Sequence, residues 1–227
     1  RFYTHIVIPP KEQKNAKAGE KVLIRITRWE EGTGIPFGAV KEILGKKGAH
    51  ETEIKAILRD KGIIDEFPHS VLAETEQIEN NYADLFQKEV RLRKDIRSTR
   101  TFTIDPEDAK DFDDALSIKK LDDGNYEVGI HIADVSFFVR KGTTLDIEAA
   151  RRSNSLYLVD RTIPMLPSAL SNGLCSLRPN EDRLTFSAIL HLTPRGEIQK
   201  QWFGKTIIHS HKRFTYEEAQ KILDGKG

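Results

Sequence analysis

Five aspartates crowd one short stretch of the chain between two apolar runs. In the segment IDPEDAKDFDDAL, residues 104–116, the carboxylates are Asp105, Asp108, Asp111, Asp113 and Asp114. Carboxylates packed this densely repel one another and raise each other's pKa unless a cation neutralises them. Hard divalent ions prefer oxygen ligands, so an all-carboxylate site fits Mg²⁺ or Mn²⁺. Such sites most often serve phosphoryl transfer, in which two ions about 4 Å apart hold the attacking water and the leaving oxygen of a phosphodiester.

Other cation sites fit this spacing less well. An EF-hand loop counted from Asp111 would need glycine where Leu116 stands and glutamate where Asp122 stands. Zinc is disfavoured because the cluster contains no cysteine or histidine. A solvated acidic loop without any metal stays open on the spacing alone. The residues by themselves therefore indicate a metal-dependent enzyme acting on phosphate esters, and they do not name its substrate.

A few other side chains could carry chemistry. Cys175 lies in the apolar context LCSL, where a buried structural role is expected. His209 and His211 form a His-x-His pair on a strand-like stretch, for which metal binding is the weaker interpretation. His131 is expected to be a structural histidine on a strand. The prolines of Ile163–Pro167 predict a rigid loop.

The elements around the aspartates must place them at a strand end, in a partly buried pocket. Alternating and apolar runs predict a mixed α+β arrangement for this half of the chain. Strands are expected at Thr101–Ile104, Ala115–Ile118, Asn125–Val139, Arg183–Thr193 and Gln199–Ser210, turns at Leu121–Gly124 and Pro194–Gly196, and helices at Thr144–Leu158 and Tyr216–Leu223.

The first part of the chain has a different residue pattern. Lys21–Trp29 alternates as a half-buried strand, and a second short strand is expected at Ala39–Gly45 after several glycines. This pattern is typical of a small β-barrel of the OB type, which binds single strands. Aromatic residues available for base stacking are Phe2, Tyr3, Trp29 and Phe37, and a core role for each of them stays open. Helices are expected at His50–Lys61 and Phe67–Ile78.

Composition sets the broad class. The 227 residues are 38% hydrophobic and 31% charged, with a net charge of +1, which excludes a uniformly basic surface. The charge is uneven, because residues 1–61 carry +5 and residues 62–227 carry −4. A basic module beside an acidic one fits a polyanion-binding arm next to a metal-binding centre, and ordinary surface scatter is the alternative. No apolar run is long enough to span a membrane, no secretory leader opens the chain, and a single cysteine fits the cytoplasm.

Four motifs taken together resemble the catalytic domain of the ribonuclease II/ribonuclease R family. They are IDPEDAKDFDDAL, HIADVSFFV, SLYLVDRTIPMLP and LSNGLCSLRPNEDRL, in that order and without large gaps, from about Thr101 to Gly227. The first part resembles the cold-shock, OB-type domain that precedes this catalytic domain in ribonuclease R. The phrase LSNGLCSL and the basic arm favour ribonuclease R over ribonuclease II.

This resemblance implies an activity and a site. The activity is processive hydrolytic removal of 5′-nucleoside monophosphates from the 3′ end of single-stranded RNA. The family's catalytic, Mg²⁺-binding aspartates match Asp105, Asp111, Asp113 and Asp114, and Asp108 lies outside that pattern. The matching position of Tyr157 holds a tyrosine that stacks on a terminal base and helps to set the length of the final product. The segment containing Met165 is placed by the resemblance beside the RNA path.

The resulting expectation is an α+β fragment of a longer nuclease. Its divisions are a cold-shock/OB-like domain over 1–85, truncated at its N-terminus, an exposed basic connector over 86–100, and the first part of the catalytic domain over 101–227. The family's catalytic domain continues further, so the isolated chain is expected to be inactive or weakly active. We expect a cytoplasmic monomer without an evident protein partner. The alternative is a non-catalytic RNA-binding or chaperone module with an inert nuclease-like domain, which the four intact aspartates disfavour.

Overall fold

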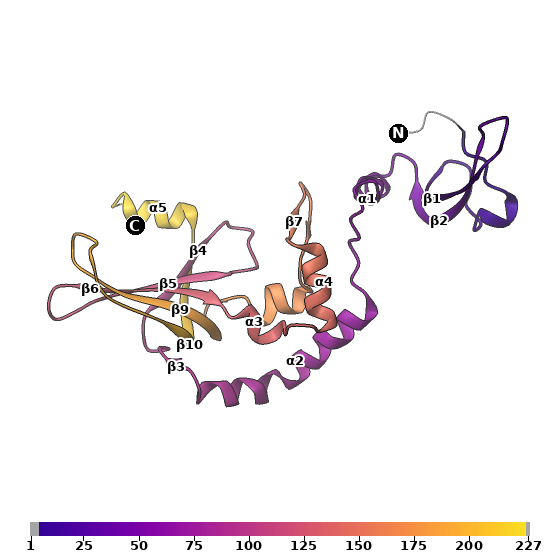
Figure 1. Cartoon of the computed structure of the whole chain (residues 1–227). Coiled ribbons are helices and arrows are strands. Elements are labelled where there is room, and N and C mark those ends of the chain that lie inside the picture. The colour runs from indigo at the N-terminus through magenta and orange to yellow at the C-terminus, as the bar shows by residue number, and fades with distance from the viewer. Residues whose placement is uncertain (1–4, 226–227) are drawn as a thin grey trace. The chain divides into compact units, whose positions relative to one another are not determined.

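The computed structural model describes residues 5–225 and divides into two compact units (Figure 1). The first unit ends at Glu66, and the second begins at Phe67. Phe2 and Tyr3, which the sequence offers for base stacking, lie outside the described residues.

The first unit is built on one antiparallel strand pair. It contains η1 (Pro10–Glu12), β1 (Glu20–Trp29), β2 (Pro36–Lys46) and α1 (His50–Asp60), as the sequence predicts for both strands and the helix. Several bulges shift the β1–β2 register, and Val7 bridges to Phe37 in parallel. Bulges increase the local twist of a strand pair, which suits a small OB-type barrel. Arg28 covers one face of Phe37, with 4.2 Å between the guanidinium carbon and the ring centroid, whereas Trp29 is half exposed.

Helix α2 begins the second unit and is longer than the sequence indicates. It runs from His69 to Val90, so residues 86–90 of the expected exposed connector are helical. Apolar side chains continue at helical spacing through Ile78, Tyr82 and Leu85, and they pack against the core of the second unit. The compact units are therefore divided at residue 66 rather than at the expected 85.

The rest of the expected connector also differs from a solvated segment. Arg93 is buried and forms an ion pair with Asp134, with 2.7 Å between Nη2 and Oδ2. A second pair joins Arg93 Nε to Glu89 at 2.6 Å. A charged side chain leaves water only where opposite charges and hydrogen bonds replace its solvation, and both are supplied here. Charge count alone could not have revealed these partners.

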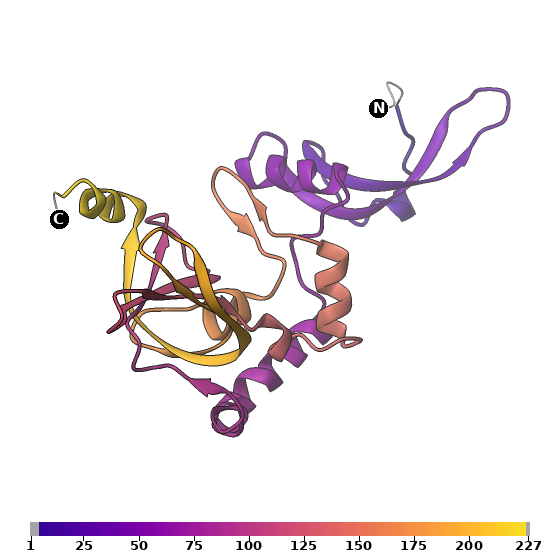
Figure 2. The ribbon, with the colours of Figure 1, turned by 60° about the vertical axis from the view of Figure 1, so that its left-hand side comes forward.

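A six-stranded mixed sheet forms the body of the second unit. Its strands are β3 (Lys94–Asp95), β4 (Thr101–Asp105), β5 (Asp114–Lys120), β6 (Tyr126–Ala133), β9 (Asp182–Leu192) and β10 (Ile198–Thr215), in the order β3-β10-β4-β5-β6-β9. The first part of β10 pairs antiparallel with β9, and its last part pairs parallel with β4. The sheet therefore curls round and closes on itself through β10, as Figure 2 shows.

Helices and a short hairpin surround this sheet. They are α3 (Val135–Phe138), α4 (Thr144–Arg152), the hairpin strands β7 (Leu156–Tyr157) and β8 (Thr162–Ile163), the π-helix η2 (Ala169–Leu174) and α5 (Tyr216–Leu223). Two expectations need correction. The strand expected to reach Val139 stops at Ala133, and the helix expected to reach Leu158 stops at Arg152. Ser153 adopts a positive φ of 68°, which ends α4, and the buried Phe137 and Phe138 pack better on a helical turn than on one strand face.

The space enclosed by the curled sheet is lined by polar groups. His131 is fully buried, and its two ring nitrogens lie 2.7 Å from Ser187 Oγ and 2.9 Å from Ser117 Oγ. Ser187 and Thr185 each bond in turn to the hydroxyl of Thr206. Burial lowers the pKa of His131 to about 4, so the imidazole is neutral at physiological pH. The expected structural role of His131 is confirmed by this network.

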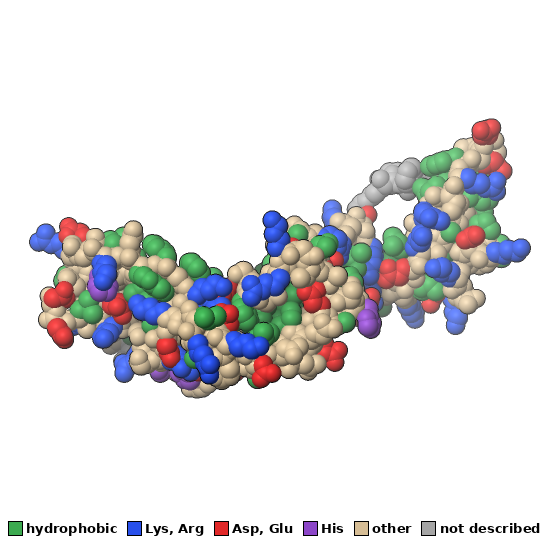
Figure 3. Space-filling model, turned by 60° about the horizontal axis from the view of Figure 1, so that its bottom comes forward, with side chains coloured by type: hydrophobic (Ala, Val, Ile, Leu, Met, Phe, Trp, Pro, Cys, Tyr) green, Lys and Arg blue, Asp and Glu red, His purple; other side chains and the backbone are tan. Residues whose placement is uncertain are grey.

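The surface and the helices add two observations. Figure 3 shows basic and acidic side chains interspersed over the displayed face of the second unit, which agrees with the small net charge. Within residues 5–225, no helix combines the length and the apolar character needed to cross a membrane.

Candidate functional site

The acidic segment joins two neighbouring strands of the sheet. β4 ends at Asp105, β5 begins at Asp114, and the two strands pair antiparallel. The intervening loop, residues 106–113, which we call the acidic loop, carries Asp111 and Asp113. Because a chain that turns back between paired strands stays at one end of both, the four carboxylates share one edge of the sheet. This is the strand-end position that the apolar flanks predict.

Asp105, at the end of β4, is partly buried. Burial raises the pKa of its carboxyl, and the negative charges of Asp114 and Asp111 raise it further. The Thr103 hydroxyl and the Arg213 guanidinium lower the pKa, but they do not cancel the effect of burial and like charge. These surroundings therefore destabilise the ionised form of Asp105 relative to a free aspartate.

The carboxyl of Asp113, in the acidic loop, also has a raised pKa. Its surface is exposed, yet it lines a concave region where protein atoms displace part of its hydration. This burial raises its pKa, and the charges of Asp111, Asp114 and Asp105 add to the shift. Mutual perturbation of carboxylates marks a site that needs a compensating positive charge.

One carboxylate oxygen of Asp105 is poorly satisfied. Oδ2 is buried and makes no well-aligned hydrogen bond, and the nearby Thr103 hydroxyl does not cancel the effect of burial on the Asp105 pKa. A buried, unsatisfied acceptor costs on the order of 1–3 kcal/mol, and more when it is charged. A hard cation with oxygen ligands would satisfy this atom and offset the repulsion, so the donor set fits a divalent metal. Within residues 5–225, no three of these aspartates place one oxygen each within 4.8 Å of one another, so the coordination geometry stays a prediction.

Tyr157 lies beside the acidic loop. Its hydroxyl donates a hydrogen bond to Asp111 Oδ2 at 3.2 Å, and 67% of the residue is exposed. Burial of the hydroxyl end, together with the charge of Asp111, raises the pKa of Tyr157. The residue stands on β7 and not in the expected helical stretch. Its ring is therefore open to a ligand while its hydroxyl touches the carboxylate cluster.

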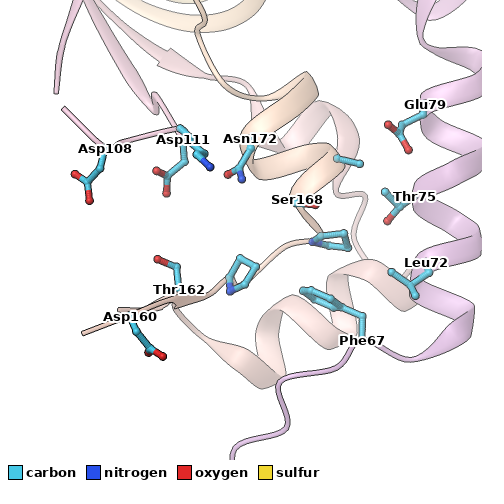
Figure 4. Close-up of a pocket in the computed structure, with 14 residues that line it drawn as sticks. Phe67, Leu72, Thr75, Glu79, Asp108, Asp111, Asp160, Thr162, Ser168 and Asn172 are labelled. Atoms are coloured by element: carbon cyan, nitrogen blue, oxygen red, sulfur yellow. The ribbon is translucent and has the colours of Figure 1, made fainter. Parts of the chain in front are cut away.

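Two cavities meet at Asp111. The smaller one, of about 300 Å³, is lined by Asp111, Asp113, Tyr157, Cys175, Met165 and other residues. The larger one, of about 740 Å³, appears in Figure 4 with Asp108 and Asp111 at one end and Phe67 and Leu72 at the other. The prolines of the expected rigid loop contribute to its wall. Asp108 thus faces the larger cavity, outside the set of four matched aspartates.

The remaining sequence candidates are engaged by neighbouring residues. His209 Nδ1 lies 2.7 Å from Asp182 Oδ1, and His211 Nδ1 accepts the backbone N–H of Thr101 at 3.3 Å. Cys175 is buried, which raises the pKa of its thiol to about 12 and confirms the structural expectation. Sequence reasoning missed two other residues, Ser176 and Arg213, which contact the acidic loop. The LCSL motif holds Ser176, but nothing in the spacing pointed to its partner.

The fold and the site define a class of protein. It is a strand-rich OB-type unit followed by a mixed α+β domain that presents a carboxylate-rich loop at the edge of its sheet. The RNB domain profile matches residues 93–227, and the cold shock domain profile matches residues 1–68. The chain therefore belongs to the RNB family of exoribonucleases, the ribonuclease II/ribonuclease R family, and carries a cold-shock-type domain before the catalytic one.

Individual relatives support this family assignment. The chain is 46% identical over 200 residues to DIS3-like exonuclease 2 of Xenopus tropicalis, covering 88% of this chain and 24% of that protein. It is 41% identical over 208 residues to an Arabidopsis thaliana protein named inactive exonuclease DIS3L2, covering 91% of this chain and 19% of that protein. The structure of Mycoplasma genitalium RNase R in complex with double-stranded RNA superposes with a TM-score of 0.88 at 30% identity, covering all of this chain and 40% of the other. The chain thus spans about a quarter or less of these curated relatives' length.

Proposed function

We propose that this chain is the metal-binding part of a hydrolytic 3′→5′ exoribonuclease that releases 5′-nucleoside monophosphates processively from single-stranded RNA. The observation that carries the proposal is that the acidic loop and the strand ends on either side of it keep all four aspartates at one sheet edge, with Asp105 Oδ2 buried and without a well-aligned hydrogen bond. Family membership supports the substrate class, because the similar Mycoplasma genitalium RNase R binds RNA. We infer that the cation is Mg²⁺, with Mn²⁺ as a substitute, because every donor in the set is a carboxylate.

The roles of the residues follow from their positions. Asp105, Asp111, Asp113 and Asp114 would hold the metal. A divalent cation held by them would supply positive charge to stabilise a phosphate ester and would make a nearby water easier to ionise. The exposed ring of Tyr157 can stack on the terminal base, since stacking holds single strands without sequence preference. The cavity between Tyr157 and Asp113 brings a stacked nucleotide close to the carboxylates.

A second candidate function is RNA binding without cleavage. The Arabidopsis thaliana relative named inactive shows that similarity over this segment also occurs in a protein without activity. The retained aspartates favour the enzyme over this alternative, because a module that only binds RNA gains nothing from crowded like charges.

The test uses 5′-labelled single-stranded RNA and the full-length protein from which this chain derives. Mg²⁺ is added or removed with EDTA, and Asp113→Asn is compared with Asp122→Asn, a control at an exposed turn. We expect a short 5′ remnant from wild type and from Asp122→Asn, and loss of at least about 100-fold in rate for Asp113→Asn or in EDTA. RNA that is bound but left intact by the wild-type protein would favour the binding module. The same assay with residues 1–227 alone tells whether this part suffices.

A further inference from the structure

The acidic loop has little regular structure of its own. Residues 106–113 lie between β4 and β5, and in the described part of the chain one backbone hydrogen bond, from Ala109 N to Pro106 O at 3.1 Å, lies wholly within them. Like charges also favour expansion of this segment. A loop in this situation keeps a defined shape only if groups outside it supply the missing contacts.

Ser176 supplies such contacts near the end of the loop. It is fully buried, accepts the backbone N–H of Phe112 at 3.0 Å, and donates its own hydrogen to Lys110 O at 2.9 Å. Leu177 N, the next residue along, donates to Phe112 O at 2.9 Å. The side chain of Phe112 is buried in the core. These contacts fix the backbone on both sides of Asp111.

Arg213 supplies the contacts at the start of the loop. It stands on the last part of β10, opposite Thr103 of β4. Its Nη2 donates to the carbonyl oxygens of Pro106 at 2.5 Å and Glu107 at 2.7 Å. The guanidinium carbon also lies 5.4 Å from the ring centroid of Phe112. A planar guanidinium binds two adjacent acceptors in a fixed direction, which an ammonium group does less well.

We propose that Arg213 and Ser176 are positioning residues that hold the acidic loop in the shape required for metal binding. Arg213 holds the backbone after Asp105, and Ser176 holds the backbone around Asp111 and before Asp113. Neither residue is one of the four proposed metal ligands, and the side-chain hydrogen bonds that carry the proposal go to the loop backbone. We expect them to affect metal binding mainly through the loop, because groups that hold the backbone beside metal ligands orient those ligands. The charge of Arg213 also acts directly on the Asp105 carboxyl, and Arg213→Lys keeps that charge. The proposal rests on the proposed metal-binding function of the four aspartates.

Two measurements on the metal-free and metal-loaded chain test this. The first is hydrogen exchange of the loop amides without metal, and the second is Mn²⁺ affinity followed by the loss of the free-ion EPR signal. The variants are Arg213→Met, Arg213→Lys and Ser176→Ala. The matched control is Arg195→Met, which makes the same change at the exposed β9–β10 turn.

The expected result is a local one. Arg213→Met and Ser176→Ala should speed exchange in residues 106–113 while β6 and β9 keep their protection, and they should weaken Mn²⁺ binding by about 10–100-fold. Arg213→Lys should restore only part of this affinity, because the ammonium keeps the charge but not the rigid, planar group that directs Nη2 at the two carbonyl oxygens. Arg195→Met should behave as wild type in both measurements.

Contrary results are distinguishable from failure of the proposed function. Exchange in the loop that is unchanged in both Arg213→Met and Ser176→Ala overturns the proposal, as does a uniform loss of protection across the sheet in both variants. Mn²⁺ affinity equal to wild type in both variants also overturns it. If wild type itself shows no saturable Mn²⁺ binding, the metal site fails and the proposal as stated fails with it, whereas the metal-free exchange still shows whether the two residues hold the loop.

Discussion

The interior of the curled sheet and the acidic loop at its edge both take polar groups away from water, but they differ in how those groups are compensated. In the interior, the imidazole of His131 is neutral and bonded to Ser187 and Ser117, and further hydroxyls continue the chain of bonds. At the edge, Asp105 and Asp113 have raised pKa values, and a carboxylate oxygen of Asp105 has no well-aligned hydrogen bond.

We interpret the polar groups of the interior as structural and the carboxylates at the edge as functional. Neutral groups that satisfy one another contribute to a specific packing arrangement and need nothing from outside. Like charges held together lower the free energy of unfolding unless a ligand of opposite charge binds. We therefore attribute the presence of the four aspartates at this edge to the binding of such a ligand. Substitutions in the two regions should therefore change different observables.

The largest expected effect is on metal affinity. Replacing both Asp105 and Asp113 by asparagine should weaken Mn²⁺ binding by about 100-fold, because two of the four charged donors are lost. His131→Gln should leave the affinity unchanged. EPR titration of free Mn²⁺ measures both variants, and a similar loss in His131→Gln would remove the distinction between the two regions.

The next effect is the pH dependence of stability. The pKa of His131 lies at about 4 in the folded chain against 6.5 for an ordinary histidine, so the unfolded chain binds the proton more readily. The stability contributed by neutral His131 is complete above pH 6.5 and is lost as the pH falls to about 4, amounting to roughly 3 kcal/mol.

Urea unfolding between pH 7 and 4.5 measures this contribution. His131→Gln should show a clearly smaller fall in the free energy of unfolding than wild type over the same range. Parallel pH profiles for the two proteins would mean that other groups control the acid sensitivity.

A smaller effect of opposite sign is expected at the acidic loop. Asp113→Asn should stabilise the metal-free chain by about 0.5 kcal/mol, because one of several repelling charges is removed from a position that still contacts water. Asp122→Asn, at the turn between β5 and β6, serves as the control. Thermal unfolding in EDTA would contradict the interpretation if Asp113→Asn were the less stable variant.

The smallest effect concerns the Tyr157 hydroxyl. Tyr157→Phe removes one hydrogen bond to Asp111, so Mn²⁺ affinity should change by no more than about two-fold. Tyr157→Ala removes the ring as well, and in the full-length protein it should lengthen the final oligonucleotide. An unchanged product with Tyr157→Ala would remove the proposed stacking role.

Much of this architecture could be predicted from local patterns. The strand alternation and apolar flanks around the aspartates predicted β4, β5 and the α+β class, and helices α1 and α5 follow their periodicity. The pattern misjudged α2 and α3, because packing of Tyr82, Phe137 and Phe138 against the core overrode the appearance of the local sequence. It also missed the end of α4, where Ser153 takes a positive φ.

By itself, the sequence determined which chemistry is possible and which family the chain resembles, because residue types and short spacings are local properties. Only the tertiary structure decided that Tyr157 contacts Asp111, that Arg93 pairs with Asp134, and that Ser176 and Arg213 hold the acidic loop. These contacts join residues that lie between about forty and more than one hundred positions apart. The Arg213 contact, for example, depends on the parallel pairing of β10 with β4, which no local pattern encodes.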